Sequence, residues 1–437
     1  MGTRKNCAWM IGLALITQLA LLGCTGNGAA DLVDEGLEAS ESPSAGSTST
    51  GAVTLTWYTF PDGRGGSPGQ AELADSCVAG AGGRYTIEVE ELSGFIEDHA
   101  AQLEAAIAAG EPVDLMSLDT TLLADFAAAG YLSPLRDADQ ARLRDTMLRG
   151  PLRAQTVDDQ VVAFPLASNT QLLWYRKSVA RRAGLELSRP LTWRELIAAA
   201  ESARTTVQVQ AAQYEGYTVW LNSLIEGAGG DILEPDSRPG RAMAQVVHGL
   251  ATSSAGDPDL DSTTELETHE RFFAGDAGFM VNWPYILHGP WRDDAAWDQD
   301  GLGWDRYPRS VSGRPARPPL ADVGLAVADV SEHRRLAMKA ARCLSTREHQ
   351  IDFMLSYGWP SGLASVYDDP RIREAYPMAD LLRTSLQSGA PRPETSNYWE
   401  VSSALQGVLW PPDQVDPQST PREAQRAVDA ALGVVIG

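Results

Sequence analysis

The sequence predicts an α/β fold in which a parallel sheet is covered by helices on both faces. Strand-type and helix-type segments alternate regularly between residues 53 and 129, and two of the helix-type segments end at Gly110 and Gly130. The strand-type segment 113–118 is mostly apolar, as expected for a strand buried on both faces. Strands that alternate with helices form parallel sheets with helices on both sides, which is why we expect this fold class.

The first strand is expected at residues 53–58, because β-branched and aromatic residues alternate there up to turn residues at 61–63. The next elements, in order, are a helix at 69–78, a strand at 84–90, a helix at 99–109, the strand at 113–118 and a helix at 121–129. Ligands of parallel sheets bind beyond the carboxyl ends of the strands. Asp62 and Asp119 directly follow two of these strands and are therefore candidate ligand-binding residues.

Further along the chain, residues 161–165 and 172–175 have the composition of two more strands. Thr192 and Glu195 have the spacing of a capping box, in which each side chain bonds a free amide at the start of a helix. Residues 420–423 repeat this pattern, with proline at the first helical position. Both patterns predict helix starts and not active sites.

The N-terminal segment has the composition of a secretory signal peptide. Arg4 and Lys5 precede an apolar stretch at 8–22 that is too short to span a bilayer. The stretch ends before Cys24 in a sequence that resembles a bacterial lipobox, so we expect residues 1–23 to be removed and Cys24 to be lipidated. The alternative is an ordinary signal peptide in which Cys24 is incidental.

Residues 24–51 are rich in Gly, Ser, Thr, Ala and acidic side chains, a composition that cannot bury enough apolar surface to order itself. We therefore expect a flexible linker that holds a soluble body off the membrane. The body, residues 52–437, is long enough for two globular lobes.

Two cysteines remain if Cys7 leaves with the signal peptide and Cys24 is lipidated. An even pair outside the cell suggests a disulfide between Cys77 and Cys343. Two buried free cysteines are the alternative, since pairing requires Cα atoms within about 7 Å of each other.

The formal net charge of −23 argues against nucleic acid as a partner, because phosphates are bound by Lys and Arg. Residues 65–69 match the hydrolase pattern G-x-S-x-G, but Pro68 lacks the N–H that this motif uses in its oxyanion hole. The six histidines show no short metal-ligand spacing, and no ATP-binding GxxxxGK[ST] loop occurs. Adjacent aspartates such as 293–294 are poor candidates for a glycosidase pair, since neighbours on a loop rarely face one bond. We expect a protein that is not an enzyme and uses no metal or cofactor.

Five segments in order resemble the sugar-binding components of bacterial ABC importers, the maltose-type extracellular solute-binding family. They are residues 100–135, 165–196 ("PLASNTQLLWYRKSVARRAGL" within it), 272–286 ("GDAGFMVNWPYI"), 357–366 ("GWPSGLASVY") and 391–405 ("APRPETSNYWEVSSALQ"). Within that family, the chain is most similar to the trehalose-binding lipoproteins of high-GC bacteria.

The resemblance implies a type II periplasmic-binding-protein fold, with two α/β lobes joined by a multi-segment hinge and a ligand cleft between them. The first lobe would comprise residues 52–164 plus 320–365. The second would comprise residues 165–319 plus 366–437.

The resemblance also implies the function of a non-catalytic receptor. It would capture a trehalose-like or maltose-like sugar and deliver it to the permease subunits of an ABC importer, as a monomer lipid-anchored to the outer face of the cell membrane. Two alternatives are a lipid-anchored glycan hydrolase, and the same fold with a glycerophosphodiester, a polyamine or a peptide as its ligand.

Sugar binding requires flat aromatic faces against the pyranose ring and polar groups at its hydroxyls. By the resemblance, Trp283 and Trp359 are the cleft aromatics, although either could be an ordinary core residue. The polar candidates implied by the resemblance are Asp62, Asp119, Asn169, Glu267 and Arg392. The pattern departs near Glu267, because His269 stands where relatives often carry Arg. A helix cap or a solvated face is the alternative for each carboxylate.

Overall fold

The computed structural model describes residues 52–61, 69–185, 187, 189–275, 277–288 and 301–434. The expected signal peptide, Cys24, the linker and Asp62 lie outside the described residues.

The first sheet has five strands in the order β2-β1-β3-β11-β6. Their bounds are β1 Val53–Thr59, β2 Tyr85–Glu91, β3 Leu115–Asp119, β6 Phe164–Thr170 and β11 Leu320–Val327. β1 pairs in parallel with β2 and β3, as predicted, while β11 is antiparallel to both β3 and β6. The parallel arrangement predicted from the N-terminal alternation is therefore found among β2, β1 and β3, but not where β11 pairs with β3 and β6. β11 enters it from a distant part of the chain.

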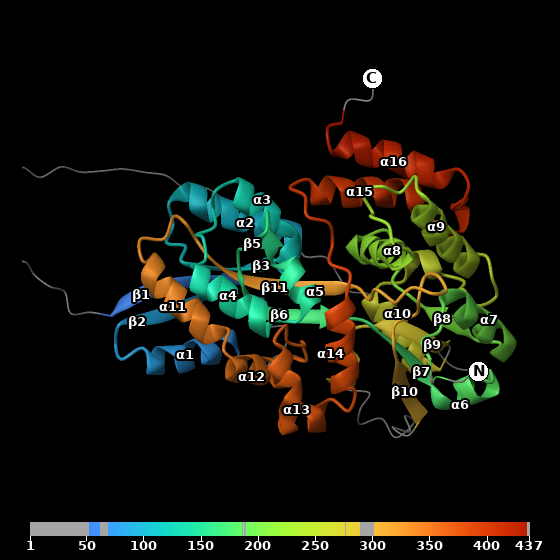
Figure 1. Ribbon diagram of the computed structural model, residues 1–437, viewed down its shortest axis with the longest axis horizontal. Helices are drawn as coiled ribbons and strands as arrows, with labels where there is room; N and C mark the ends of the chain where they lie inside the picture. The colour runs from blue at the N-terminus through green and yellow to red at the C-terminus, as the bar shows by residue number, and fades with distance from the viewer. Residues whose placement is uncertain are drawn as a thin grey trace, which may run out of the picture. The chain divides into compact units, whose positions relative to one another are not determined.

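Helices cover both faces of this sheet, as predicted (Figure 1). On one face, Leu103 of α2 and Phe126 of α3 are packed with Met116 in one core cluster. On the other face, Leu73 of α1 belongs to the same core cluster as Leu115. The bounds are α1 Gln70–Gly80, α2 Ile96–Ala109, α3 Leu123–Ala128, α4 Asp137–Thr146, α5 Arg149–Ala154, α11 Arg334–Leu344, α12 Arg347–Tyr357, α13 Pro370–Ala375 and α14 Ala379–Ser388.

The second sheet has four strands in the order β10-β7-β9-β8. Its strands are β7 Leu172–Arg176, β8 Thr206–Gln208, β9 Ala277–Asn282 and β10 Leu302–Asp305. Helices α8, α9, α15 and α16 gather above it in Figure 1. The helices of this part are α6 Lys177–Arg182, α7 Trp193–Ala203, α8 Glu215–Ala228, α9 Arg238–Ala251, α10 Glu265–Ala274, α15 Tyr398–Leu409 and α16 Thr420–Ala431.

Three connections link the elements of the two sheets. β6 continues into β7 through Gln171, β10 is followed by β11, and α14 is followed by α15. α14 packs on β6 of the first sheet and on α5, which covers that sheet. In contrast, α15 packs on α8 and α16 beside the second sheet. The segments between these elements are therefore the places where one group of elements is joined to the other.

Two local predictions require correction. The single strand expected at 161–165 is the end of a short hairpin, β4 Thr156–Val157 with β5 Gln160–Val161, followed by the start of β6. The capping box expected at 420–423 is not formed. The hydroxyl of Thr420 instead accepts a hydrogen bond from the Asp416 amide at 2.9 Å, and the residue before the helix, Ser419, makes no side-chain cap bond. The capping box of Thr192 and Glu195 is present at the start of α7, as predicted.

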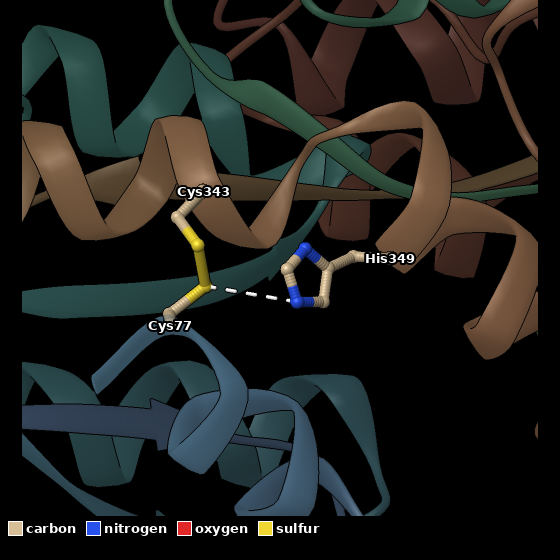
Figure 2. Close-up of side chains that lie close together, drawn as sticks. All are labelled: Cys77, Cys343 and His349. Carbon is tan, nitrogen blue, oxygen red and sulfur yellow. Dashed lines mark hydrogen bonds between the residues drawn. A yellow bond between two sulfur atoms is a disulfide. The ribbon is translucent and has the colours of Figure 1, made fainter. Parts of the chain in front are cut away.

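A disulfide joins Cys77 on α1 to Cys343 on α11, with the two Cα atoms 5.8 Å apart (Figure 2). The pairing expected from the cysteine count is therefore present. His349, in the first turn of α12, lies beside it, with its Nε2 3.9 Å from Cys77 Sγ. Among the described residues, no helix is both long enough and apolar enough to cross a bilayer.

Candidate functional site

A buried arginine joins a carboxylate at the end of a strand of the first sheet to a carboxylate on a helix beside the second. Arg392 lies between α14 and α15, and only 5% of its side chain is exposed. Its Nη2 donates to Asp119 Oδ1 at 2.7 Å and to Oδ2 at 3.0 Å, and its Nη1 donates to Glu215 Oε1 at 3.3 Å. Asp119 ends β3 of the first sheet, and Glu215 begins α8 beside the second. Arg392 therefore bridges the two groups of elements.

Glu215 is held by several donors in addition to Arg392. The hydroxyl of Ser402 donates to Glu215 Oε2 at 2.6 Å, and the phenol of Tyr398 donates to Oε1. Both donors belong to α15. Burial raises the pKa of Glu215, and the nearby Arg392 charge opposes that rise. A buried carboxylate needs this kind of compensation, because an unpaired buried charge is strongly destabilising.

A second group of side chains, rich in aromatic rings, surrounds Glu265, the first residue of α10. The indole Nε1 of Trp283 donates to Glu265 Oε1 at 3.5 Å, and the phenol of Tyr214 donates to Oε2 at 2.7 Å. The phenol of Tyr285 donates to the Glu265 backbone carbonyl at 3.2 Å. Burial raises the pKa of both tyrosines well above their usual value, so both phenols remain protonated donors.

The charged group and the aromatic group meet at the start of α8. Tyr214 contacts Glu265, and the next residue, Glu215, contacts Arg392. Two consecutive residues therefore connect the segment that carries Trp283 to the segment that carries Arg392.

A cavity of about 240 Å³ lies at the end of β1, between residues of the first sheet and Tyr285, which follows β9 of the second. Trp359 and Tyr285 line it, together with Phe60 from the end of β1 and Val323 from β11. Trp359 is partly buried and makes an edge contact with Phe353 at a ring-centroid distance of 6.3 Å. Aromatic faces and a few polar groups in a concave site are the usual composition of a small-ligand pocket.

A larger and more polar cavity of about 500 Å³ lies beside Arg392. Its walls include Thr120 and Thr121, directly after β3, and Asn222 and Glu226 of α8. This second cavity is therefore lined by the segment that follows β3 of the first sheet and by α8, which packs beside the second sheet.

Asp322 is a buried carboxyl group that the sequence did not single out. It lies on β11 opposite Ser168 of β6, and neither residue is exposed. Burial raises the pKa of Asp322 to about 7, against the opposing effects of Ser168 and Arg392. Nothing in the sequence around Asp322 indicates that it is buried, because an Asp in a strand is usually exposed.

Four of the residues predicted from the sequence can be placed relative to the charged group around Arg392 and the aromatic group around Glu265. Asp119 and Arg392 are in direct contact. Asn169 is half-buried on β6 and lies on the same face of the sheet as Val323, because Ala167, two residues earlier, pairs with Val323. Trp283 is only 8% exposed, with its indole held by Glu265.

In the structure Glu267 occupies a helix cap, which was the alternative to its expected role in ligand binding. Its carboxylate accepts the backbone amide of Thr264 at 3.0 Å and the Thr264 hydroxyl, forming a capping box at the start of α10. These hydrogen bonds lower the pKa of Glu267. The carboxylate that contacts the aromatic group is Glu265, two residues earlier. His269 is buried, which lowers its pKa to about 4, and its ring packs against Phe273 and Tyr285.

Sequence reasoning missed Glu265, Tyr214, Glu215 and Tyr398. A signal for the first was available, because Thr264 and Glu267 have the same S/T-x-x-E spacing that predicted the start of α7. That pattern assigns Glu267 to a helix cap, so Glu265 is the remaining first-turn carboxylate of this helix that could contact Trp283. The partners of Arg392 had no such signal, since Glu215 lies 177 residues from it along the chain.

Within the described part of the chain, one group of side chains has the spacing of metal ligands. It consists of Cys77, Cys343 and His349 (Figure 2). The two sulfur atoms are bonded to each other in the disulfide, so they are not thiolate ligands in this structure.

The model of the family described as "Bacterial extracellular solute-binding protein" matches residues 72–379. A "Probable ABC transporter-binding protein" of Deinococcus radiodurans is 25% identical over 311 residues, which cover 64% of this chain and 70% of that protein. A putative binding protein of Brucella abortus is 21% identical over 202 residues, or 42% of this chain and 47% of that one.

Solved structures share the fold. A maltose-bound protein of T. maritima matches with a TM-score of 0.69 and 23% identity, covering 88% of this chain and 100% of its own. The cyclic alpha-maltosyl-1,6-maltose binding protein of Arthrobacter globiformis matches with a TM-score of 0.71 and 19% identity, covering 87% and 99%. A solute-binding protein of Agrobacterium vitis with bound D-mannitol matches with a TM-score of 0.66 and 18% identity, covering 87% and 99%.

Proposed function

Because the chain belongs to the bacterial extracellular solute-binding proteins, we propose that it is the substrate-binding component of an ABC sugar importer. It is a non-catalytic receptor that captures a disaccharide or short oligosaccharide, either trehalose-like or maltose-like, and delivers it to the permease. Solved proteins with this fold have maltose, a cyclic maltosyl-maltose or mannitol named as their ligands, which supports a polyhydroxylated ligand here.

The observation that carries this proposal is the meeting of aromatic and charged groups at the start of α8. Sugars are bound by aromatic faces against their C–H groups and by carboxylate or guanidinium groups at their hydroxyls. Trp283 and Trp359 provide the aromatic faces, and Asp119, Arg392 and Asn169 provide the polar groups. Asp62 remains a proposed contact from the first strand's loop.

The charges near Arg392 favour a neutral ligand over a phosphodiester. Arg392 faces two carboxylates, Asp119 and Glu215, so its positive charge is already compensated. An anionic ligand would need cations that are not committed to other groups. Arg144 and Arg153 also line the 500 Å³ cavity, so this argument applies to a ligand bound at Arg392 itself.

The two lobes of the receptor follow the packing of the two sheets. The first lobe comprises residues 52–170 plus 320–388, and the second comprises residues 171–319 plus 389–434. We propose these bounds in place of 52–164 plus 320–365 and 165–319 plus 366–437, and the pairing of β6 with β11 and the packing of α14 on β6 and α5 support them. Ligand that contacts both lobes only when they are closed shifts the population towards the closed form.

The receptor is anchored through a lipidated Cys24 to the outer face of the membrane, and it acts as a monomer. The predicted signal peptide and linker support this arrangement.

The proposal is tested by a ligand screen of residues 24–437 carrying Cys24→Ser, so that no lipid is attached. Thermal shift is measured with mono- and disaccharides, glycerophosphodiesters, polyamines and peptides, since a ligand of the folded state raises the melting temperature. We expect a shift with a disaccharide that is recovered intact. A shift with phosphodiesters, polyamines or peptides alone would overturn the sugar assignment, and consumption of the sugar would instead identify a hydrolase.

A further inference from the structure

Glu265 accepts hydrogen bonds from the last residue of β9 and from two of the residues that follow it. Its backbone carbonyl accepts Asn282 Nδ2 at 3.1 Å and the Tyr285 phenol at 3.2 Å. Its carboxylate accepts the Trp283 indole at 3.5 Å and the Tyr214 phenol at 2.7 Å. Three side chains of residues 282–285 are therefore attached to a single residue on a different element.

The backbone of Trp283 is fixed separately from its ring. Its amide donates to Asn282 Oδ1 at 2.8 Å, and Pro284 follows it with a restricted backbone. The amide group of Asn282 is itself held, because its Nδ2 also donates to Thr268 Oγ1 at 3.1 Å. What these bonds leave undetermined is the rotation of the indole, and the bond to Glu265 restricts that rotation.

We propose that Glu265 is a positioning residue that sets the orientation of the Trp283 ring for stacking on the ligand. The inference rests on the proposed function of Trp283 as a sugar-stacking residue. An ionised carboxylate has only acceptor positions, so its two oxygens can fix two donors, the indole N–H and the Tyr214 hydroxyl, at the same time. A ring that is already oriented does not have to be ordered when the ligand binds.

The chain provides a matched control on the same helix. Glu267 is also a glutamate in the first turn of α10, but its carboxylate bonds Thr264 and not the aromatic group. Loss of the Glu267 carboxylate should therefore weaken the helix start, whereas loss of the Glu265 carboxylate should change the Trp283 ring.

The first measurement is made without ligand, on residues 24–437 with Cys24→Ser. The protein is labelled with 15N-tryptophan, and the indole N–H resonance of Trp283 is identified as the one that Trp283→Phe removes. We expect Glu265→Ala to shift or broaden that resonance. Glu267→Ala should leave it in place while lowering the melting temperature. Because this readout needs no sugar, it tests the positioning role even if no sugar binds and the proposed function fails.

The second measurement is the affinity for whichever sugar the ligand screen identifies, determined by calorimetry. Glu265→Ala should weaken binding by roughly three- to tenfold, the cost of ordering one large side chain. Glu267→Ala should leave the affinity unchanged. Glu265→Gln, which keeps one acceptor oxygen, should recover part of both the resonance position and the affinity, and it serves as the test variant if Glu265→Ala does not fold.

Two results would overturn the inference. The first is an unmoved Trp283 resonance in both Glu265 variants. The second is equal loss of affinity in the Glu265 and Glu267 variants, which would assign the effect to the helix start and not to the orientation of the ring.

Discussion

Arg392 is the residue on which the charge of the candidate site depends. Its guanidinium is nearly inaccessible and lies against Asp119, Glu215 and the ring of Tyr398, whose centroid is 5.8 Å from its central carbon. Such a residue is not interchangeable with Lys, because only the planar guanidinium can donate to two carboxylates from separate nitrogens. The resemblance identified Arg392 and Asp119 separately, but neither the resemblance nor the spacing indicated that they form a pair.

Trp359 and Trp193 provide a contrast between a tryptophan that we propose contacts the ligand and a core tryptophan. Trp359 is partly buried and lines the 240 Å³ cavity, so Trp359→Ala should weaken sugar binding by about tenfold or more with little change in stability. Trp193 is fully buried beside Trp220 and Tyr307, so Trp193→Ala should cost about 3–5 kcal/mol of stability. Calorimetric titration and thermal melting separate the two effects. A large loss of stability with unchanged affinity for Trp359→Ala would place Trp359 in the core.

Asp322 should make stability fall as the pH rises. Its pKa is about 7 in the folded protein and near 3.8 in the unfolded chain. Below the lower value both states are protonated. Between about pH 4 and pH 7 the folded state binds a proton that the unfolded chain has lost. The free energy of unfolding therefore falls by at most about 1.4 kcal/mol per pH unit, and it levels off above pH 7.

Asp322→Asn should remove this dependence, since the amide does not titrate. Melting temperatures at pH 5 and pH 8 are the measurement, and the variant should lose less stability between them than the parent protein does. If both proteins lose the same stability between pH 5 and pH 8, the titration of Asp322 is not the cause of the pH dependence.

At the scale of elements, the sequence predicted the N-terminal strands and helices well, because each has its own local period and its own stop signal. It predicted where α7 and α16 begin, but the expected capping box is present only at α7, whereas the Thr420 hydroxyl at α16 accepts the Asp416 amide. Local spacing does not decide between these two outcomes, because the same hydroxyl can serve the helix or the preceding turn.

The two helix starts give an element-scale prediction. Thr192→Ala should destabilise the protein by about 1 kcal/mol, because the Thr192 hydroxyl accepts the Glu195 amide. Ser419→Ala, at the corresponding position before α16, should cost less than about 0.5 kcal/mol, since Ser419 makes no cap bond and is exposed. Denaturant unfolding of both variants is the test. Equal costs would show that the Thr192 cap contributes nothing specific.

At the scale of the molecule, the family resemblance correctly implied the fold, whereas periodicity alone gave only an α/β class. The antiparallel position of β11 could not be derived from local pattern, because its partner β6 lies about 150 residues earlier in the chain. The pairing of Asp119 with Arg392 and the hydrogen bond from Tyr214 to Glu265 were missed for the same reason, because contacts between distant segments leave no periodic pattern in the sequence.

The disulfide gives a prediction for the whole molecule. It closes a loop of 266 residues between α1 and α11, so replacing both cysteines, Cys77→Ser with Cys343→Ser, should cost about 2–5 kcal/mol. A lower melting temperature, on the order of 5 °C, is expected relative to the parent protein with Cys24→Ser. Sugar affinity should not change, because neither cysteine lines the described cavities. A weaker affinity without a lower melting temperature would contradict this assignment.

The adjacency of Tyr214 and Glu215 limits how this receptor can diversify. A substitution of Tyr214 alters the contact with Glu265 and not the contact with Arg392, and a substitution of Glu215 does the reverse. Ligand preference can therefore change during evolution through single substitutions at these positions. An insertion or deletion at the start of α8 would displace both partners together, disconnecting Glu265 and Arg392 in a single event. Changes of ligand preference in this lineage should therefore arise through exchanged side chains, with the length of the chain before α8 kept constant.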